Sequence, residues 1–183
     1  SGLFAFGTPS ISCSNPLFTP SELATLCTPA NIAANQATFK GTGDRITLYA
    51  ARRSVESGPR IDNYSSDSIR EVIGMRGGWG EAWTYDVYGQ YGISDVHDNQ
   101  GGYLGVQQIN NALDVVPNPA TGGVAGVAAG APVCAITLAG YDPACQPWNI
   151  WNAGGVTPAQ LAYLGVSSTY DTTATEYVVS GSV

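Results

Sequence analysis

The segment from residue 66 to residue 94 constrains the fold most strongly, because apolar and polar side chains alternate along it on both sides of a glycine-rich turn. After the turn one parity is almost entirely apolar, and it consists of Trp83, Tyr85, Val87, Gly89, Tyr91 and Ile93. Before the turn the apolar parity consists of Ile69, Ile73 and Met75, interrupted by Glu71. A period of two places the two parities on opposite faces of an extended strand. The alternation therefore predicts a β-hairpin whose turn, at residues 77 to 82, uses the positive φ angles open to glycine.

The length of this hairpin is unusual for a soluble protein. Each arm is about ten residues long, whereas soluble strands usually have about five or six. A strand tilted across a bilayer needs about 9–11 residues, with lipid-facing apolar side chains alternating with lumen-facing polar ones. Trp79 and Trp83 flank the turn, where the aromatic side chains of a membrane interface would lie. A long hairpin in a soluble sandwich or barrel has the same pattern, so the alternation alone leaves both architectures open.

Composition favours a mainly β chain and argues against a nucleic-acid partner. Only 11% of the residues are charged, and the formal net charge is −7, whereas phosphate binding requires a basic surface. The 23 glycines, with many Asn, Ser and Thr residues, indicate strands joined by long loops. No apolar run approaches the ~18 residues of a transmembrane helix, and we recognise no signal peptide at the N-terminus.

The four cysteines form two local pairs, Cys13 with Cys27 and Cys134 with Cys145. An even number of cysteines at short spacing indicates disulfides and hence an oxidising compartment, such as the periplasm or the cell exterior. Free thiols or a zinc site are the alternatives. The spacing does not fit the usual zinc motifs, and the chain has one histidine.

Along the chain we expect a single segment made of four parts. Residues 1–43 form a loop with a short helix opened by the capping-box sequence Thr19-Pro20-Ser21-Glu22. Residues 44–94 contain a first strand, over 44–55, and the hairpin. Residues 95–171 form a long loop with two helices, one over Ile109 to Val116 that Pro117 ends and one opened by Thr157. Residues 172–183 form a strand still alternating at the last residue, as expected of a piece of a larger sheet.

Six stretches of the chain form a recognisable series, and in order they are ARRSVESGPR (51–60), REVIGMRG (70–77), WTYDVYGQYG (83–92), NALDVV (111–116), CQPWNIW (145–151) and VVSGSV (178–183). In their order and spacing these stretches resemble TonB-dependent outer-membrane receptors of Gram-negative bacteria. The resemblance implies part of a plugged 22-stranded barrel that takes up a bulky nutrient, such as an iron chelate or an oligosaccharide. It also implies a periplasmic turn, extracellular cysteine-containing loops, and the lipid bilayer and the rest of the barrel as partners.

The chain departs from this family in several respects. It has no plug domain, no N-terminal box for the energy-coupling protein and no C-terminal aromatic ending, and at most five strands are expected. Such a segment cannot close a barrel by itself. Because unpaired strand edges pair with other chains in water, the alternative is a cross-β fibril core, in which copies of the fragment assemble into an amyloid-like extracellular filament.

Few residues are candidates for a site, and we predict no enzyme activity, metal or cofactor. His97 with Asp95 and Asp98 would be a weak metal or acid–base group, and a solvated loop is the preferred interpretation. Tyr141, Trp148 and Trp151, with Tyr163, are a candidate ligand platform, although packing around the disulfide-tied loop explains them more simply. Four arginines could face a lumen and attract an anion, or could simply be the polar parity of their strands: Arg52, Arg53, Arg70 and Arg76.

Overall fold

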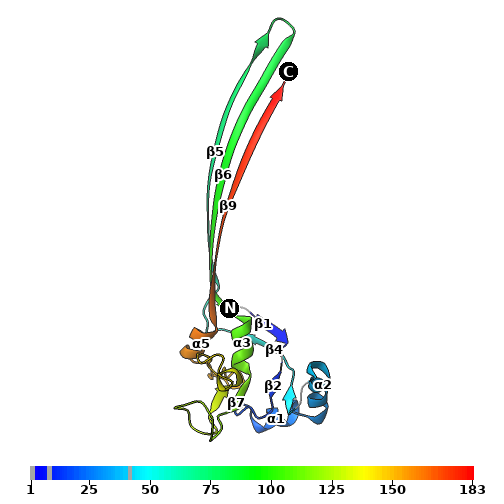
Figure 1. The fold of residues 1–183 in the computed structure, drawn as a ribbon, viewed down its shortest axis with the longest axis vertical. Coiled ribbons are helices and arrows are strands. Elements are labelled where there is room, and N and C mark those ends of the chain that lie inside the picture. Colours follow the sequence, from blue (N-terminus) through cyan, green and yellow to red (C-terminus); the bar gives the residue numbers. More distant parts are fainter. Residues whose placement is uncertain (1–2, 8–9, 41–42) are drawn as a thin grey trace. The chain divides into compact units, whose positions relative to one another are not determined.

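The computed structural model describes residues 3–7, 10–40 and 43–183, and these divide into two compact units (Figure 1). We call the first the disulfide unit; it comprises Ser1–Arg60 and Gly102–Val166. The second, Ile61–Gly101 with Ser167–Val183, is the long sheet. Each unit is described by itself.

The long sheet has three strands in the order β5-β6-β9. They are β5 (Ile61–Trp79), β6 (Trp83–Leu104) and β9 (Gly165–Ser182). β5 and β6 pair antiparallel without a bulge, from Ile61 opposite Gly101 to Trp79 opposite Trp83. The predicted hairpin is therefore confirmed. Its turn is shorter than predicted, because only residues 80–82 lie outside the strands and only Gly80 among them has a positive φ, of 69°.

The arms of the hairpin are about twice as long as predicted, at 19 and 22 residues. The strand predicted from residue 172 likewise begins at Gly165. The extra length is mostly polar, and its apolar side chains, such as Ile61 and Tyr64, fall on both faces, so it carries no alternation that a sequence pattern could reveal. Main-chain pairing does not require apolar side chains, and polar pairs accompany it, such as His97 Nδ1 of β6 with Asp171 of β9.

β9 runs antiparallel to β6, as the arrows in Figure 1 and the side-chain contacts indicate. Tyr91 contacts Tyr177, with ring centroids 5.2 Å apart. Further along β6, Asp95 accepts a hydrogen bond from Thr173 at 2.6 Å. Residue numbers therefore rise along β6 as they fall along β9. Among the residues described, no further strand pairs with β5 or β9, so the sheet is open and forms no closed barrel.

The first half of the disulfide unit contains short strands rather than one longer strand. β1 (Leu3–Gly7) pairs with β4 (Tyr49–Arg53), and β2 (Ile11–Ser12) pairs with β3 (Arg45–Ile46). The single strand predicted over 44–55 is thus wrong, because its two halves pair with different partners.

Three helices begin at a proline that follows a capping threonine: α1 (Pro20–Leu26), α2 (Pro29–Phe39) and α5 (Pro158–Leu164). The predicted capping box is confirmed in α1, where the Thr19 amide donates to Glu22 Oε2 at 2.7 Å. α5 has the same arrangement with Thr157 and Gln160. α2 was not predicted, because it buries only Asn35 and so has no apolar stripe, although the Thr28 side chain caps it by accepting from the Asn31 amide.

The second half contains α3 (Val106–Leu113), the pair β7 (Val115–Pro117) and β8 (Pro132–Cys134), and α4 (Ala135–Leu138). The helix predicted over Ile109 to Val116 is confirmed in its middle, but it begins earlier, at Val106, and ends at Leu113, because Val116 lies in β7. The long loop predicted over 95–171 is wrong at both ends, since β6 and β9 extend into it.

One core joins the two halves of the disulfide unit. Residues before the hairpin (Ile11, Phe18 and Ile46) cluster with residues after it: Ile109, Ala112, Leu113, Cys134, Cys145, Trp148 and Leu164. Both predicted disulfides, Cys13–Cys27 and Cys134–Cys145, are present beside this core. The disulfide unit is therefore a packed unit, not a pair of separate loops.

Candidate functional site

The register divides the long sheet into two faces by residue parity. Met75 lies opposite Val87, and contacts between β6 and β9 likewise join residues of one parity, such as Tyr91 with Tyr177. Because side chains alternate between faces, all odd-numbered residues of the three strands share one face. We call this the odd face and the opposite one the even face.

The odd face carries an apolar band over the half of the sheet nearest the turn. The band consists of Ile69, Ile73, Met75, Trp79, Trp83, Tyr85, Val87, Tyr91, Ile93, Tyr177, Val179 and Val183. Ile73 is 83% exposed and Val179 is 86% exposed. Exposed apolar surface of this extent is typical of a surface that contacts a partner or a membrane.

One charge, Glu71, interrupts the apolar band. It lies opposite Tyr91, which in turn contacts Tyr177, so the carboxylate belongs to an aromatic row near the end of the band distant from the turn. At the other end, Trp79 and Trp83 face each other across the register. Aromatic pairs thus lie near both ends of the band.

The even face is mainly polar over the same length, with Val72, Tyr88 and Val178 as apolar exceptions. Arg70 donates to Gln90, and Gln90 Nε2 donates to Glu176 Oε2 at 3.1 Å, which links all three strands. Arg76 lies opposite Asp86. Arg70 and Arg76, two of the four arginines considered as lumen-facing, thus lie in the long sheet, on the face opposite the apolar band.

Arg52 and Arg53 lie in β4 of the disulfide unit instead. Arg52 Nη2 is 2.6 Å from Glu56 Oε1, and the hydrogen bond from Arg52 holds the pKa of the Glu56 carboxyl below its ordinary value. Arg52 therefore pairs with a carboxylate of the disulfide unit itself, that of Glu56.

The candidate histidine group is divided between the faces. His97 Nδ1 pairs with Asp171, and Asp95 accepts from Thr173, both on the odd face beyond the apolar band. Asp98 lies on the even face. Within the described part of the chain, no group of three His, Cys, Asp or Glu residues could hold a metal ion.

The candidate aromatic platform is not assembled. Trp148 is 1% exposed and belongs to the core, whereas Tyr141 is 83% exposed. Trp151 packs edge-on against Phe18, with centroids 4.6 Å apart. Trp148 is therefore not part of an accessible ligand platform. Packing around the disulfide explains the positions of both Trp148 and Trp151.

Tyr163 takes part in a polar contact inside the disulfide unit. Its hydroxyl donates to Asp142 Oδ2 at 2.7 Å and accepts from Asn111 Nδ2 at 3.3 Å. Burial, reinforced by the Asp142 carboxylate, raises the pKa of Tyr163 to about 12 from its ordinary value of 10.0.

This pKa predicts alkaline destabilisation that depends on Tyr163. As the pH rises above 10, the unfolded chain loses the tyrosine proton before the folded chain does, so the stability present below pH 10 falls by about 1 kcal/mol by pH 11. Tyr163→Phe should remove this slope from the free energy of unfolding measured between pH 9 and pH 11. Tyr141→Phe, at an exposed position, should leave it in place, and an equal slope in the Tyr163→Phe variant would contradict the assignment.

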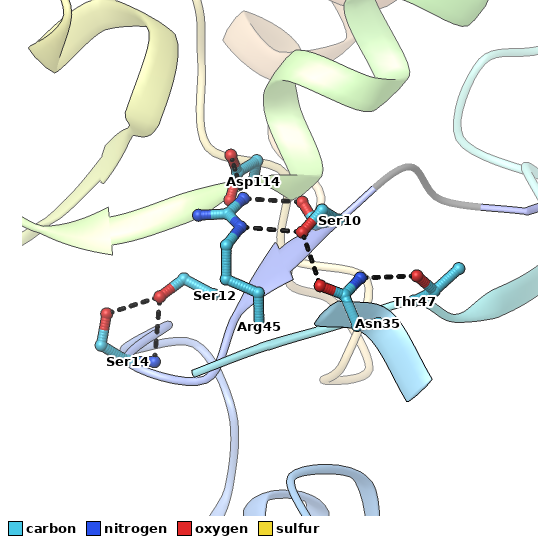
Figure 2. A network of polar contacts seen from close by, with 7 residues as sticks. All are labelled: Ser10, Ser12, Ser14, Asn35, Arg45, Thr47 and Asp114. Carbon is cyan, nitrogen blue, oxygen red and sulfur yellow. Dashed lines mark hydrogen bonds and ion pairs between the residues drawn. The ribbon is translucent and has the colours of Figure 1, made fainter. Parts of the chain in front are cut away.

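A polar network centred on Arg45 connects the two halves of the disulfide unit (Figure 2). Arg45 Nη2 donates to Asp114 Oδ2 at 2.6 Å and to the Ser10 carbonyl at 2.7 Å, and Arg45 Nε donates to Ser10 Oγ at 2.8 Å. From Ser10 the network continues to buried Asn35, whose Nδ2 donates to Thr47 Oγ1 at 2.7 Å. It joins α2, β3 and the end of α3, and we interpret it as structural.

Replacing Arg45 by methionine should destabilise the disulfide unit by about 2 kcal/mol, because the partly buried Asp114 carboxylate loses its cation. Arg53→Met, at an exposed position in β4, the next strand along the chain, should change stability by less than about 0.5 kcal/mol. Urea unfolding of the two variants measures the difference. Equal midpoints would show that the network contributes nothing.

Comparisons with protein-family models, curated proteins and solved structures find no match to this chain. None of the helices in the described residues is long and apolar enough to cross a membrane. The two disulfides indicate an oxidising, extracytoplasmic location. The apolar band and the mainly polar even face are thus the features on which a functional argument can be based.

Proposed function

We propose that the long sheet is part of the wall of an outer-membrane β-barrel that takes up a bulky nutrient, with the odd face against lipid. The observation that carries this proposal is the apolar band. From Ile69 to Trp79 it follows about 34 Å of extended strand. At the 35–45° tilt of barrel strands this corresponds to about 24–28 Å across the bilayer, close to the ~25 Å apolar belt of such barrels.

The chemistry of both faces supports the same orientation. The tryptophans at the turn and the tyrosines at the far end would lie at the two interfaces, where barrel proteins concentrate aromatic residues. Glu71 would lie near an interface, where a charge costs much less than at the midplane. The even face, with its Arg70–Gln90–Glu176 chain, would line the lumen.

The connections of the sheet support an assignment of its sides. The turn joining β5 to β6 is short, and the residues before β5 and between β6 and β9 form the disulfide unit. Barrel proteins have short periplasmic turns and long extracellular loops, so the turn would be periplasmic and the disulfide unit extracellular. Both edges of the sheet would pair with further barrel strands, because lipid does not tolerate unpaired main-chain groups. The resemblance to TonB-dependent receptors agrees with this proposal.

Cell fractionation tests the proposal. An antibody against the disulfide unit should label intact cells, and the antigen should stay in the outer-membrane fraction after an alkaline carbonate wash. Release of the antigen by the wash would contradict a membrane-spanning sheet.

A structural filament is the second candidate, and the two open edges of the sheet favour it. No strand in the described part of the chain pairs with the outer edge of β5 or β9, which have 19 and 18 residues, so each edge could template another copy. In this case the antigen should be found in shed fibres that diffract at about 4.8 Å along their axis.

A further inference from the structure

We infer that the even face carries a binding subsite for a neutral oligosaccharide, formed by Tyr64, Asp98 and Tyr170 beyond the apolar band. The inference rests on the proposed function, because it requires the even face to line a lumen. It specifies the class of nutrient, which the proposed function leaves open.

The register brings these three side chains into one row. Tyr64 in β5 lies directly opposite Asp98 in β6. On the other side of β6, His97 pairs with Asp171, so the next residue of β6, Asp98, lies beside Tyr170 of β9. All three residues are even-numbered and therefore share a face. Asp98 thus lies between two tyrosines, whose Cα atoms are about 10 Å apart across two strand spacings.

The row combines accessible rings with a carboxylate acceptor. Tyr64 is 66% exposed and Tyr170 is 60% exposed, so both rings are free to contact a ligand. Gln100 Nε2 donates to Asp98 Oδ2 at 2.8 Å. The other oxygen, Oδ1, is covered by its surroundings and has no hydrogen-bond partner among the described residues. A covered acceptor without a donor is costly, and a small rotation of the side chain would let it accept from a ligand hydroxyl.

This combination fits a sugar better than an iron chelate. The C–H face of a pyranose ring stacks on an aromatic ring, and its hydroxyl groups donate to carboxylates and amides. The even face beyond the band contains no lysine or arginine. Its residues are Asp62, Tyr64, Ser66, Ser68, Ser94, Val96, Asp98, Gln100, Ser168, Tyr170, Thr172 and Ala174. Such a surface repels anions, and ferric catecholates and acidic sugars are anionic.

Calorimetric titration of the intact protein in phospholipid vesicles tests the inference, with maltohexaose, cellohexaose, xylohexaose and mannohexaose as probes. At least one neutral probe should bind, whereas a hexagalacturonate and a ferric catecholate complex should not. Tyr64→Ala and Tyr170→Ala should each weaken binding about tenfold, as expected for the loss of a stacked ring. Asp98→Asn should weaken it by a similar factor.

Two control variants separate this subsite from other surfaces. Tyr141→Ala removes a tyrosine of the disulfide unit that is more exposed than either ring of the subsite, and Asp67→Asn removes a carboxylate of the odd face; both should bind the probe as the unaltered protein does. Circular dichroism should show the same strand content in every variant. Binding of none of the four neutral probes, tighter binding of an anionic probe, or equal affinity in the Tyr64→Ala and Tyr170→Ala variants would overturn the inference. The carbonate wash is independent of these results, so failure of the subsite is distinguishable from failure of the membrane assignment.

Discussion

Replacing Ile73 by arginine is expected to destabilise the long sheet in a bilayer by about 2–4 kcal/mol, the cost of a cation on the lipid face near the midplane of a barrel. Ile73 lies near the middle of the apolar band and is 83% exposed in the isolated chain, so the arginine meets lipid rather than a packed core. The variant should fold in vesicles at a lower yield and unfold at a lower urea concentration.

Val72→Arg is the matched control, because Val72 is the adjacent residue and lies on the even face opposite Gln90. There the new cation would face the lumen beside the Arg70–Gln90–Glu176 chain, and the change in unfolding free energy should stay within about 1 kcal/mol. Equal effects of the two substitutions, or a larger effect of Val72→Arg, would contradict the assignment of the odd face to lipid.

The second large effect is expected in the disulfide unit. Trp148→Ala should destabilise this unit by about 3–5 kcal/mol, because it removes a side chain that is 1% exposed and packed among residues from both halves of the core. The loss should be visible as faster hydrogen exchange in α3, since the Trp148 amide donates to the Ala112 carbonyl at 2.8 Å.

Tyr141→Ala is the control, because Tyr141 belongs to the same candidate platform but is 83% exposed. It should change the stability of the disulfide unit by less than about 0.5 kcal/mol. Similar exchange rates in the two variants would mean that Trp148 does not hold the two halves of the unit together.

The hairpin could be predicted because one of its faces is apolar near the turn. Where both faces become mostly polar, as from Asp67 back to Asp62, the alternation disappears although the main-chain pairing continues. The sequence pattern therefore revealed the proposed membrane-facing part of each strand and not its full length. For the same reason the strand that begins at Gly165 was predicted only from residue 172.

Local sequence signals predicted some helices of the disulfide unit and missed another. The capping boxes at Thr19 and Thr157 preceded apolar residues and gave correct helices, whereas the cap at Thr28 preceded a helix without an apolar stripe. The common Thr-Pro dipeptide was the signal that could have identified α2.

The shared core of the disulfide unit was beyond prediction from local patterns. It brings Ile11 and Ile46 together with Leu113, Trp148 and Leu164. These contacts join segments separated by the whole hairpin, and no periodicity in the sequence encodes such a pairing. Trp148 could be read as a surface or a core residue for that reason, and only the three-dimensional arrangement decides for the core.

A spin-label scan along β5 tests the central claim most directly. All four native cysteines are in disulfides, so a cysteine introduced at each position from 69 to 79 would be the free thiol that carries the label. In vesicles, labels at odd positions should collide mainly with oxygen dissolved in lipid, and labels at even positions mainly with a water-soluble nickel complex. Labels at positions 61 to 67 should be accessible to the nickel complex on both parities. If the accessibility of the labels to the nickel complex did not alternate between odd and even positions from 69 to 79, the result would contradict a membrane-spanning sheet.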